Sequence, residues 1–233
     1  MIIIYDFDGT LTPYSLPQYE ILIENGYSDD ILEEKIKNKI RTENCTLYQA
    51  YYQIYIEILK EKNIKFNKSN ICKGAKSVKF NKGVEEYFKA MQYKETGVKH
   101  YIVTSGLQEY IYQTSIEKYV QGIYGVTFKE DNGIYTDLDV LLDDTKKVEV
   151  IKNLIIENNN DKEIIYLGDG LTDKKAFEYV HSIGGKNIFI KIGENSVLKY
   201  NKLNEKNIIN KCFEPDYSEN SEIRNYIKHE INK

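Results

Sequence analysis

Short apolar runs that each stop at acidic, hydroxyl-bearing or glycine residues constrain the fold of this chain more than any other feature. Residues 2–7, 99–104 and 164–167 are such runs, and a fourth covers residues 188–190. Apolar runs of this length predict buried strands rather than helices. Because segments with helical spacing separate them, the sequence predicts an α/β fold with a parallel sheet between two layers of helices.

The segments between these strands are mostly helical in their spacing of apolar residues. Residues 123–141 differ, because alternating apolar residues around Asn132-Gly133 predict a hairpin. A crossover between parallel strands needs only roughly a dozen residues, and far more separate the first two strands. We therefore interpret residues 13–82 as an inserted helical subdomain and residues 1–12 with 83–233 as the core. The predicted helices are 16–25, 29–41, 46–62, 83–93, 108–119, 147–157, 173–181 and 221–230.

Four tyrosines gather in the predicted helix over residues 46–62: Tyr48, Tyr51, Tyr52 and Tyr55. A row of tyrosines along one helix is typical of packing against a neighbouring element, with the hydroxyls reaching water. The alternative is a pocket for a stacked or hydroxylated substrate.

Composition limits the classes of function. The formal net charge is -4 at pH 7, whereas proteins that bind nucleic-acid backbones are usually basic, so we expect no nucleic-acid partner. No apolar run approaches the ~20 residues that span a bilayer, and the N-terminus does not resemble a signal peptide, so we expect no membrane association. The 3 cysteines are far apart in the sequence, which favours a reducing cytoplasm over a disulfide framework. The sequence leaves the oligomeric state undetermined.

Ligands of open parallel sheets bind at the carboxyl ends of the strands, where this chain carries its reactive side chains. The first predicted strand leads into Asp6 and Asp8, the second into Thr104-Ser105-Gly106, and the third into residues 168–173, which include Asp169. Asp6 and Asp8 point the same way because side chains alternate along a strand. Adjacent carboxylates repel, so the cluster is best explained by a hard divalent cation such as Mg²⁺.

Two kinds of group at this edge could act on a phosphate. A carboxylate can act as a nucleophile, and a second carboxylate can supply the proton for the leaving group. The negative charge that develops on a phosphoryl group needs a cation, and Lys146 and Lys147 both precede the predicted helix that could present one.

In their order, these segments resemble the motifs of the haloacid dehalogenase-like (HAD) hydrolase superfamily. The DxDGT motif corresponds to residues 6–10, the strand ending in Ser or Thr to residues 101–106, and the GDGxxD motif to residues 168–173. A lysine opens a helix at residues 147–151, with the spacing of phosphoserine phosphatase-like members. The resemblance covers essentially the whole chain. It implies a Rossmann-like core with a helical cap of the C1 type at residues 13–82.

The resemblance also implies roles for individual residues. Asp6 would attack phosphorus, and Asp8 would protonate the leaving oxygen and then activate water. Mg²⁺ would be bound by Asp6, the backbone carbonyl of Asp8 and Asp169, with Asp173 supporting it from outside. The phosphate oxygens would be held by Ser105 with neighbouring Thr104, the amide of Gly106, and Lys147, which the motif spacing favours over Lys146.

The resulting hypothesis is a Mg²⁺-dependent phosphomonoester phosphatase that acts on a small phosphorylated metabolite through an aspartyl-phosphate. One alternative is a phosphotransferase or mutase of the same family, and another is a phospho-accepting signalling module. Asp8 argues against the signalling module because it would speed dephosphorylation. Phosphoserine phosphatases carry an acidic element in the cap that residues 13–19 do not reproduce, so the substrate stays open.

Overall fold

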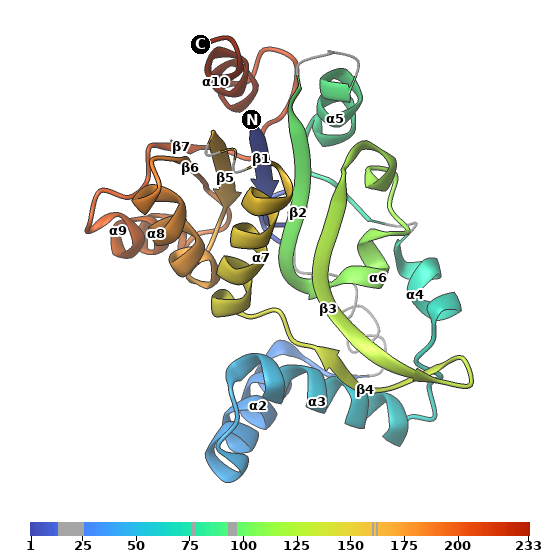
Figure 1. The fold of residues 1–233 in the computed structure, drawn as a ribbon. Coiled ribbons are helices and arrows are strands. Elements are labelled where there is room, and N and C mark those ends of the chain that lie inside the picture. The colour runs from blue at the N-terminus through green and yellow to red at the C-terminus, as the bar shows by residue number, and fades with distance from the viewer. Residues whose placement is uncertain (14–25, 76–77, 93–96, 160, 162) are drawn as a thin grey trace.

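A seven-stranded sheet forms the centre of the protein, with strand order β4-β3-β2-β1-β5-β6-β7 (Figure 1). The computed structural model describes residues 1–13, 26–75, 78–92, 97–159, 161 and 163–233. The predicted helix 16–25 and most of segment 13–19 lie outside these residues. The strands are β1 (Ile2–Tyr5), β2 (Lys99–Leu107), β3 (Gly122–Asp131), β4 (Ile134–Val140), β5 (Ile164–Gly168), β6 (Lys186–Ile190) and β7 (Lys211–Phe213).

The predicted parallel sheet is confirmed, with one antiparallel edge. β1 pairs in parallel with both β2 and β5, β3 pairs in parallel with β2, and β6 and β7 continue the sheet on the other side. Only β4 runs antiparallel among the described strands, because it returns from β3 through the predicted hairpin. All four residues of β1 are buried, as expected for a central strand that is covered on both faces.

Helices cover both faces of the sheet. Tyr166 on β5 packs against Phe177 of α8 (Lys174–Ser182), with ring centroids 5.3 Å apart. Tyr5 on β1 packs instead against Phe88 of α5 (Val84–Gln92), at 5.1 Å. Tyr166 is in register with Ile4, so the next residue along β1, Tyr5, faces the opposite side. The remaining core helices are α7 (Asp144–Glu157), α9 (Ser196–Asn204) and α10 (Glu222–Ile231).

Besides α5, three helices of the described residues lie between β1 and β2 in the sequence: α2 (Asp29–Glu43), α3 (Leu47–Glu61) and α4 (Lys68–Ala75). Figure 1 shows α2 and α3 beyond the end of the sheet, beside the β3–β4 hairpin. Tyr52 of α3 meets Phe128 of β3 edge to face, with centroids 5.7 Å apart. The insertion is therefore packed against the hairpin. Its separation from the core at residues 13–82 stays a prediction.

The structure differs from the predicted elements in several places. The predicted helix 108–119 is only a short helix, α6 (Gln108–Ile111), followed by a 3-10 turn, η1 (Glu117–Tyr119). Between them the Thr114 hydroxyl donates to the Ile111 carbonyl at 2.7 Å, which offers the backbone an alternative to helical hydrogen bonds. The helices α4 and α9 and the strand β7 were not predicted, because their sequences are short or polar. Among the described residues, no helix combines the length and apolar character needed to cross a membrane.

Candidate active site

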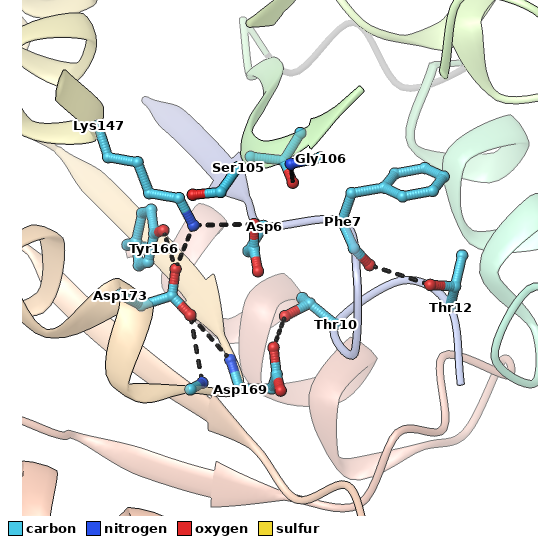
Figure 2. A network of polar contacts seen from close by, with 12 residues as sticks. Asp6, Phe7, Thr10, Thr12, Ser105, Gly106, Lys147, Tyr166, Asp169 and Asp173 are labelled. Atoms are coloured by element: carbon cyan, nitrogen blue, oxygen red, sulfur yellow. Dashed lines mark hydrogen bonds and ion pairs between the residues drawn. The ribbon is translucent and has the colours of Figure 1, made fainter. Parts of the chain in front are cut away.

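The strand order β2-β1-β5 brings the carboxyl ends of three strands to one place (Figure 2). Asp6 follows β1, Ser105 lies near the end of β2, and Asp169 and Asp173 follow β5. Asp6, Asp169 and Asp173 each offer a carboxylate oxygen, and these oxygens lie within 4.8 Å of one another. The structure thus brings together side chains from opposite ends of the sequence.

The loop after β1 turns tightly around the Phe7 carbonyl. This oxygen accepts hydrogen bonds from the amides of Leu11 at 2.9 Å and Thr12 at 3.2 Å. Gly9 has a φ of +78°, and a Cβ at this position would lie 2.5 Å from Asp169 Cγ. Only glycine fits there, both in conformation and in space. The loop can therefore lie directly against Asp169.

Lys147 reaches the acidic cluster from the first turn of α7. Its side chain is 1% exposed, and its Nζ lies 2.9 Å from Asp6 Oδ1 and 2.7 Å from Asp173 Oδ1. Burial disfavours the charged ammonium, but Asp173 and Asp6 outweigh this effect and hold the pKa of Lys147 well above its usual value. Lys146 points away and pairs with Glu149 on the surface at 2.6 Å. Of the two candidate lysines, the structure places Lys147 in the site.

Asp173 is held by donors on both of its oxygens. Oδ1 accepts from Lys147 and from the Tyr166 hydroxyl, the latter at 2.7 Å, and Oδ2 accepts from the amides of Asp169 and Gly170, both at 3.2 Å. These contacts fit a residue that orients Lys147 and the loop after β5. They agree less well with direct metal ligation, because each oxygen is already engaged.

The cluster of Asp6, Asp169 and Asp173 holds more carboxylates than the ammonium of Lys147 can neutralise. Burial, with repulsion from Asp6 and Asp173, raises the pKa of Asp169 to about 8, although Lys199 of α9 pairs with it at 3.6 Å. Burial likewise raises the pKa of Asp6 to about 6, against the attraction of Lys147. A buried set of carboxylate oxygens with excess negative charge fits a hard divalent cation such as Mg²⁺. Asp6 and Asp169 are the side chains placed to hold it.

Of the other predicted residues, Ser105 and Gly106 lie beside this cluster (Figure 2), and Asp8 lies in the loop after β1. Asp8 is half-buried, as is Ser105. The Gly106 amide donates to Thr104 Oγ1 at 3.0 Å, so a phosphate bound by this amide would replace that hydrogen bond. The hydroxyl of Tyr52 donates to the Ser105 carbonyl at 2.7 Å, which ties α3 to the end of β2.

Sequence reasoning missed several polar residues that support the site. Tyr166 lies inside an apolar strand and was assigned only to the core. The Thr10 carbonyl accepts from Asn81 Nδ2 and from the Tyr217 hydroxyl, both at 3.0 Å. Asn81 and Tyr217 are distant from Thr10 in the sequence and belong to no motif, so no local signal could have identified them.

The comparison with protein-family models identifies the chain. Residues 3–178 match the model of the haloacid dehalogenase-like hydrolases. The chain belongs to this family. In the HAD hydrolase described here, the matched region includes all the motif residues of the site, from Asp6 to Asp173. The comparison with curated proteins gives no match.

Solved structures share the fold of this HAD hydrolase. A HAD family hydrolase from Salmonella enterica serovar Typhi superposes with a TM-score of 0.69 at 20% identity, over 91% of this chain and 66% of that chain. A phosphoserine phosphatase in its apo form gives a TM-score of 0.67 at 20% identity, over 98% of both chains. A phosphoserine phosphohydrolase-like protein from Francisella tularensis gives 0.56 at 20% identity, over 90% of this chain and 93% of that chain. At these identities the similarity shows the fold.

Proposed function

We propose that this HAD hydrolase is a Mg²⁺-dependent phosphomonoester phosphatase that acts on a small phosphorylated metabolite in the cytoplasm. The observation that carries the proposal is the buried lysine, Lys147, which bridges Asp6 and Asp173 beside a third carboxylate, Asp169. This arrangement combines a nucleophile, a fixed cation and a cation-binding cluster in one place. Together they can support phosphomonoester hydrolysis through a covalent intermediate.

In the proposed first step, Asp6 attacks the phosphorus atom of the substrate. Lys147 holds Oδ1, so the attack comes from Oδ2. The raised pKa of about 6 still leaves Asp6 largely ionised at neutral pH. A bond forms between Oδ2 and phosphorus, the ester P–O bond breaks, and Asp8 gives its proton to the departing alkoxide.

The second step regenerates the enzyme. Asp8, now ionised, takes a proton from water, and the resulting hydroxide attacks the phosphorus of the aspartyl-phosphate. The bond to Asp6 breaks, and inorganic phosphate leaves. Throughout, Lys147 and Ser105 stabilise the phosphoryl oxygens through charge and hydrogen bonding. Asp173 and Tyr166 keep the Lys147 ammonium in position.

In this proposal Mg²⁺ would be held by Asp6, Asp169 and the backbone carbonyl of Asp8. When bound, it would neutralise charge between the carboxylates and the phosphoryl group. Asp173 would support this arrangement through the amides of Asp169 and Gly170. Residues 13–82 would act as a cap over the core, formed by residues 1–12 and 83–233, and would exclude water during the reaction.

The substitution Asp6→Asn tests the mechanism. We expect it to reduce hydrolysis of p-nitrophenyl phosphate to background in the presence of Mg²⁺, while the far-ultraviolet circular dichroism spectrum stays unchanged. Asp137→Asn, on the exposed part of β4, is the control and should keep full activity. Undiminished hydrolysis by Asp6→Asn would contradict the proposal. A panel of phosphorylated metabolites, with inorganic phosphate measured, would then separate hydrolysis from phosphoryl transfer to another alcohol.

A further inference from the structure

Helix α3 starts at a well-defined point close to the site. Thr46 and Gln49 form a reciprocal capping box, in which the Gln49 amide donates to Thr46 Oγ1 at 3.3 Å and the Thr46 amide donates to Gln49 Oε1 at 2.9 Å. One turn later, the Tyr52 hydroxyl binds the Ser105 carbonyl at 2.7 Å. The cap and this anchor together fix the first two turns of α3 against the end of β2.

The tyrosines of α3 have different surroundings, although the sequence suggested one stripe. Tyr55 is buried against Phe66, with ring centroids 5.3 Å apart, and Tyr52 is buried against Phe128. These two rings pack against neighbouring elements as predicted, but Tyr52 and Tyr55 are buried, so their hydroxyls do not reach water as expected. Tyr48 lies one helical turn before Tyr52, on the same side of the helix, and this position directs it to the site.

The hydroxyls of Tyr48 and Ser105 are both shielded from solvent. Neither makes a hydrogen bond of good geometry to another residue in the described part of the chain. Ser105 and Thr172 nevertheless lie near enough to the Tyr48 hydroxyl to act as hydrogen-bond partners, and this proximity lowers its pKa against the effect of burial. Buried hydroxyls are normally paired, and exceptions require an explanation. Two such groups side by side, one of them on the predicted phosphate-binding residue, are explained by a ligand oxygen that accepts from both.

The charges around Tyr48 support the role of a donor. Burial raises the pKa of its hydroxyl, and the opposing effects of Ser105, Lys147 and Thr172 only partly offset this rise. The hydroxyl therefore keeps its proton at neutral pH. The influence of Lys147 on the pKa of Tyr48 also indicates that the hydroxyl lies near the ammonium that we assign to the phosphoryl group.

We propose that Tyr48 is a substrate-binding residue whose hydroxyl donates a hydrogen bond to the phosphoryl group held by Ser105. This inference rests on the proposed phosphatase function and adds a donor from outside the four motifs. Because Tyr48 comes from the insertion, the bound phosphoryl group would connect the insertion directly to the core. A substrate's phosphoryl group, rather than its carbon skeleton, would then hold α3 over the site.

The test compares Tyr48→Phe with Tyr55→Phe, which removes the same hydroxyl from the same helix at a position packed away from the cluster. The probes are p-nitrophenyl phosphate as substrate and inorganic phosphate as competitive inhibitor, both with Mg²⁺. For Tyr48→Phe we expect KM and the inhibition constant of phosphate to rise about tenfold, which corresponds to about 1.4 kcal/mol, with kcat changed less than threefold. Tyr55→Phe should keep both constants within about twofold of wild type.

A different pattern would overturn the inference. If the phosphate inhibition constant of Tyr48→Phe stays within twofold of wild type, its hydroxyl does not contact the phosphoryl group. Equal rises in both variants would assign the effect to the packing of α3. If the wild-type protein itself neither hydrolyses the substrate nor binds phosphate, the proposed function fails, and this inference fails with it.

Discussion

Two buried polar clusters begin at consecutive residues, Tyr5 and Asp6, and they differ in charge. On one side, the Tyr5 hydroxyl shares hydrogen bonds with Tyr87 at 2.6 Å and with His100 Nδ1 at 2.9 Å. On the other side, Asp6 contacts the ammonium of Lys147 at 2.9 Å. Both clusters are almost completely buried, so burial alone does not distinguish them.

The two clusters differ in whether their groups are charged at neutral pH. Burial raises the pKa values of Tyr5 and Tyr87 and lowers that of His100 to about 4, so all three stay neutral at physiological pH. Such a cluster can stabilise the fold at little electrostatic cost. The cluster at Asp6 keeps charges in the protein interior, which is unfavourable unless they are paired. The chain thus gives up stability at the proposed active site and gains stability one residue earlier.

The largest effect should come from removing the cation of the charged cluster. Lys147→Met leaves Asp6 and Asp173 buried without their partner, so we expect a loss of about 3–5 kcal/mol in the free energy of unfolding and a loss of phosphatase activity. Urea unfolding and p-nitrophenyl phosphate hydrolysis measure the two effects. Lys146→Met is the matched control, and both properties should stay at wild-type values. Equal effects of the two substitutions would contradict the assignment of Lys147.

The neutral cluster should show its effect in the pH dependence of stability. The pKa of His100 is lowered from 6.5 to about 4 in the folded protein, so between these pH values the unfolded chain binds the additional proton. Stability is therefore lost as the pH falls from 6.5 to 4, by roughly 3 kcal/mol in total. The His100→Gln variant should not show this loss of stability. Urea unfolding midpoints of wild type and variant, measured at pH 7.5 and 4.5, test this expectation. Identical pH profiles would show that His100 is not kept neutral by burial.

The charged cluster should show the opposite sign. The pKa of Asp169 is raised to about 8 in the folded state from 3.8, so its ionisation costs stability at high pH. Without metal at pH 8.5, Asp169→Asn should be more stable than wild type, and this difference should vanish as the pH falls towards 4. Mg²⁺ should raise the melting temperature of wild type but not of the variant. Equal stabilisation of both by Mg²⁺ would place the ion elsewhere.

The smallest effect should follow the loss of one neutral hydroxyl. Tyr87→Phe removes the partner of the Tyr5 hydroxyl at 2.6 Å and should lower the free energy of unfolding by about 1 kcal/mol. Because this cluster lies on the other side of β1, KM and kcat should not change. A fall in kcat larger than that of Tyr55→Phe would show that the two clusters are coupled.

Much of the site was predictable because its residues follow strands directly. The carboxyl-end rule places Asp6, Ser105 and Asp169 at one edge from the sequence alone, and the parallel sheet brings them together. The structure then places Lys147 in the site and Lys146 on the surface, a choice for which the sequence offers only the motif spacing. Sequence patterns therefore predict the positions of side chains that directly follow a strand or begin a helix.

The rest depends on packing between elements that are distant in sequence. Tyr166 looks like a core residue until Asp173 is seen to accept its hydrogen bond. In the sequence the tyrosines of α3 form one row at helical spacing. Only the structure shows that Tyr48 lies near Ser105, whereas Tyr55 packs against Phe66. The edge strand β7 is only 3 residues long, too short to give an alternating pattern. None of these features has a signature within a single segment.

The anchoring of Thr10 has a consequence for how much of the chain the loop after β1 requires. Its carbonyl is held by Asn81 and by Tyr217, and Tyr217 lies beyond the region that matches the family, which ends at residue 178. A chain that reaches residue 178 already contains every motif, yet the loop after β1 lacks one of these two supports. The hydrogen bonds of this loop are complete only in a chain that includes residue 217.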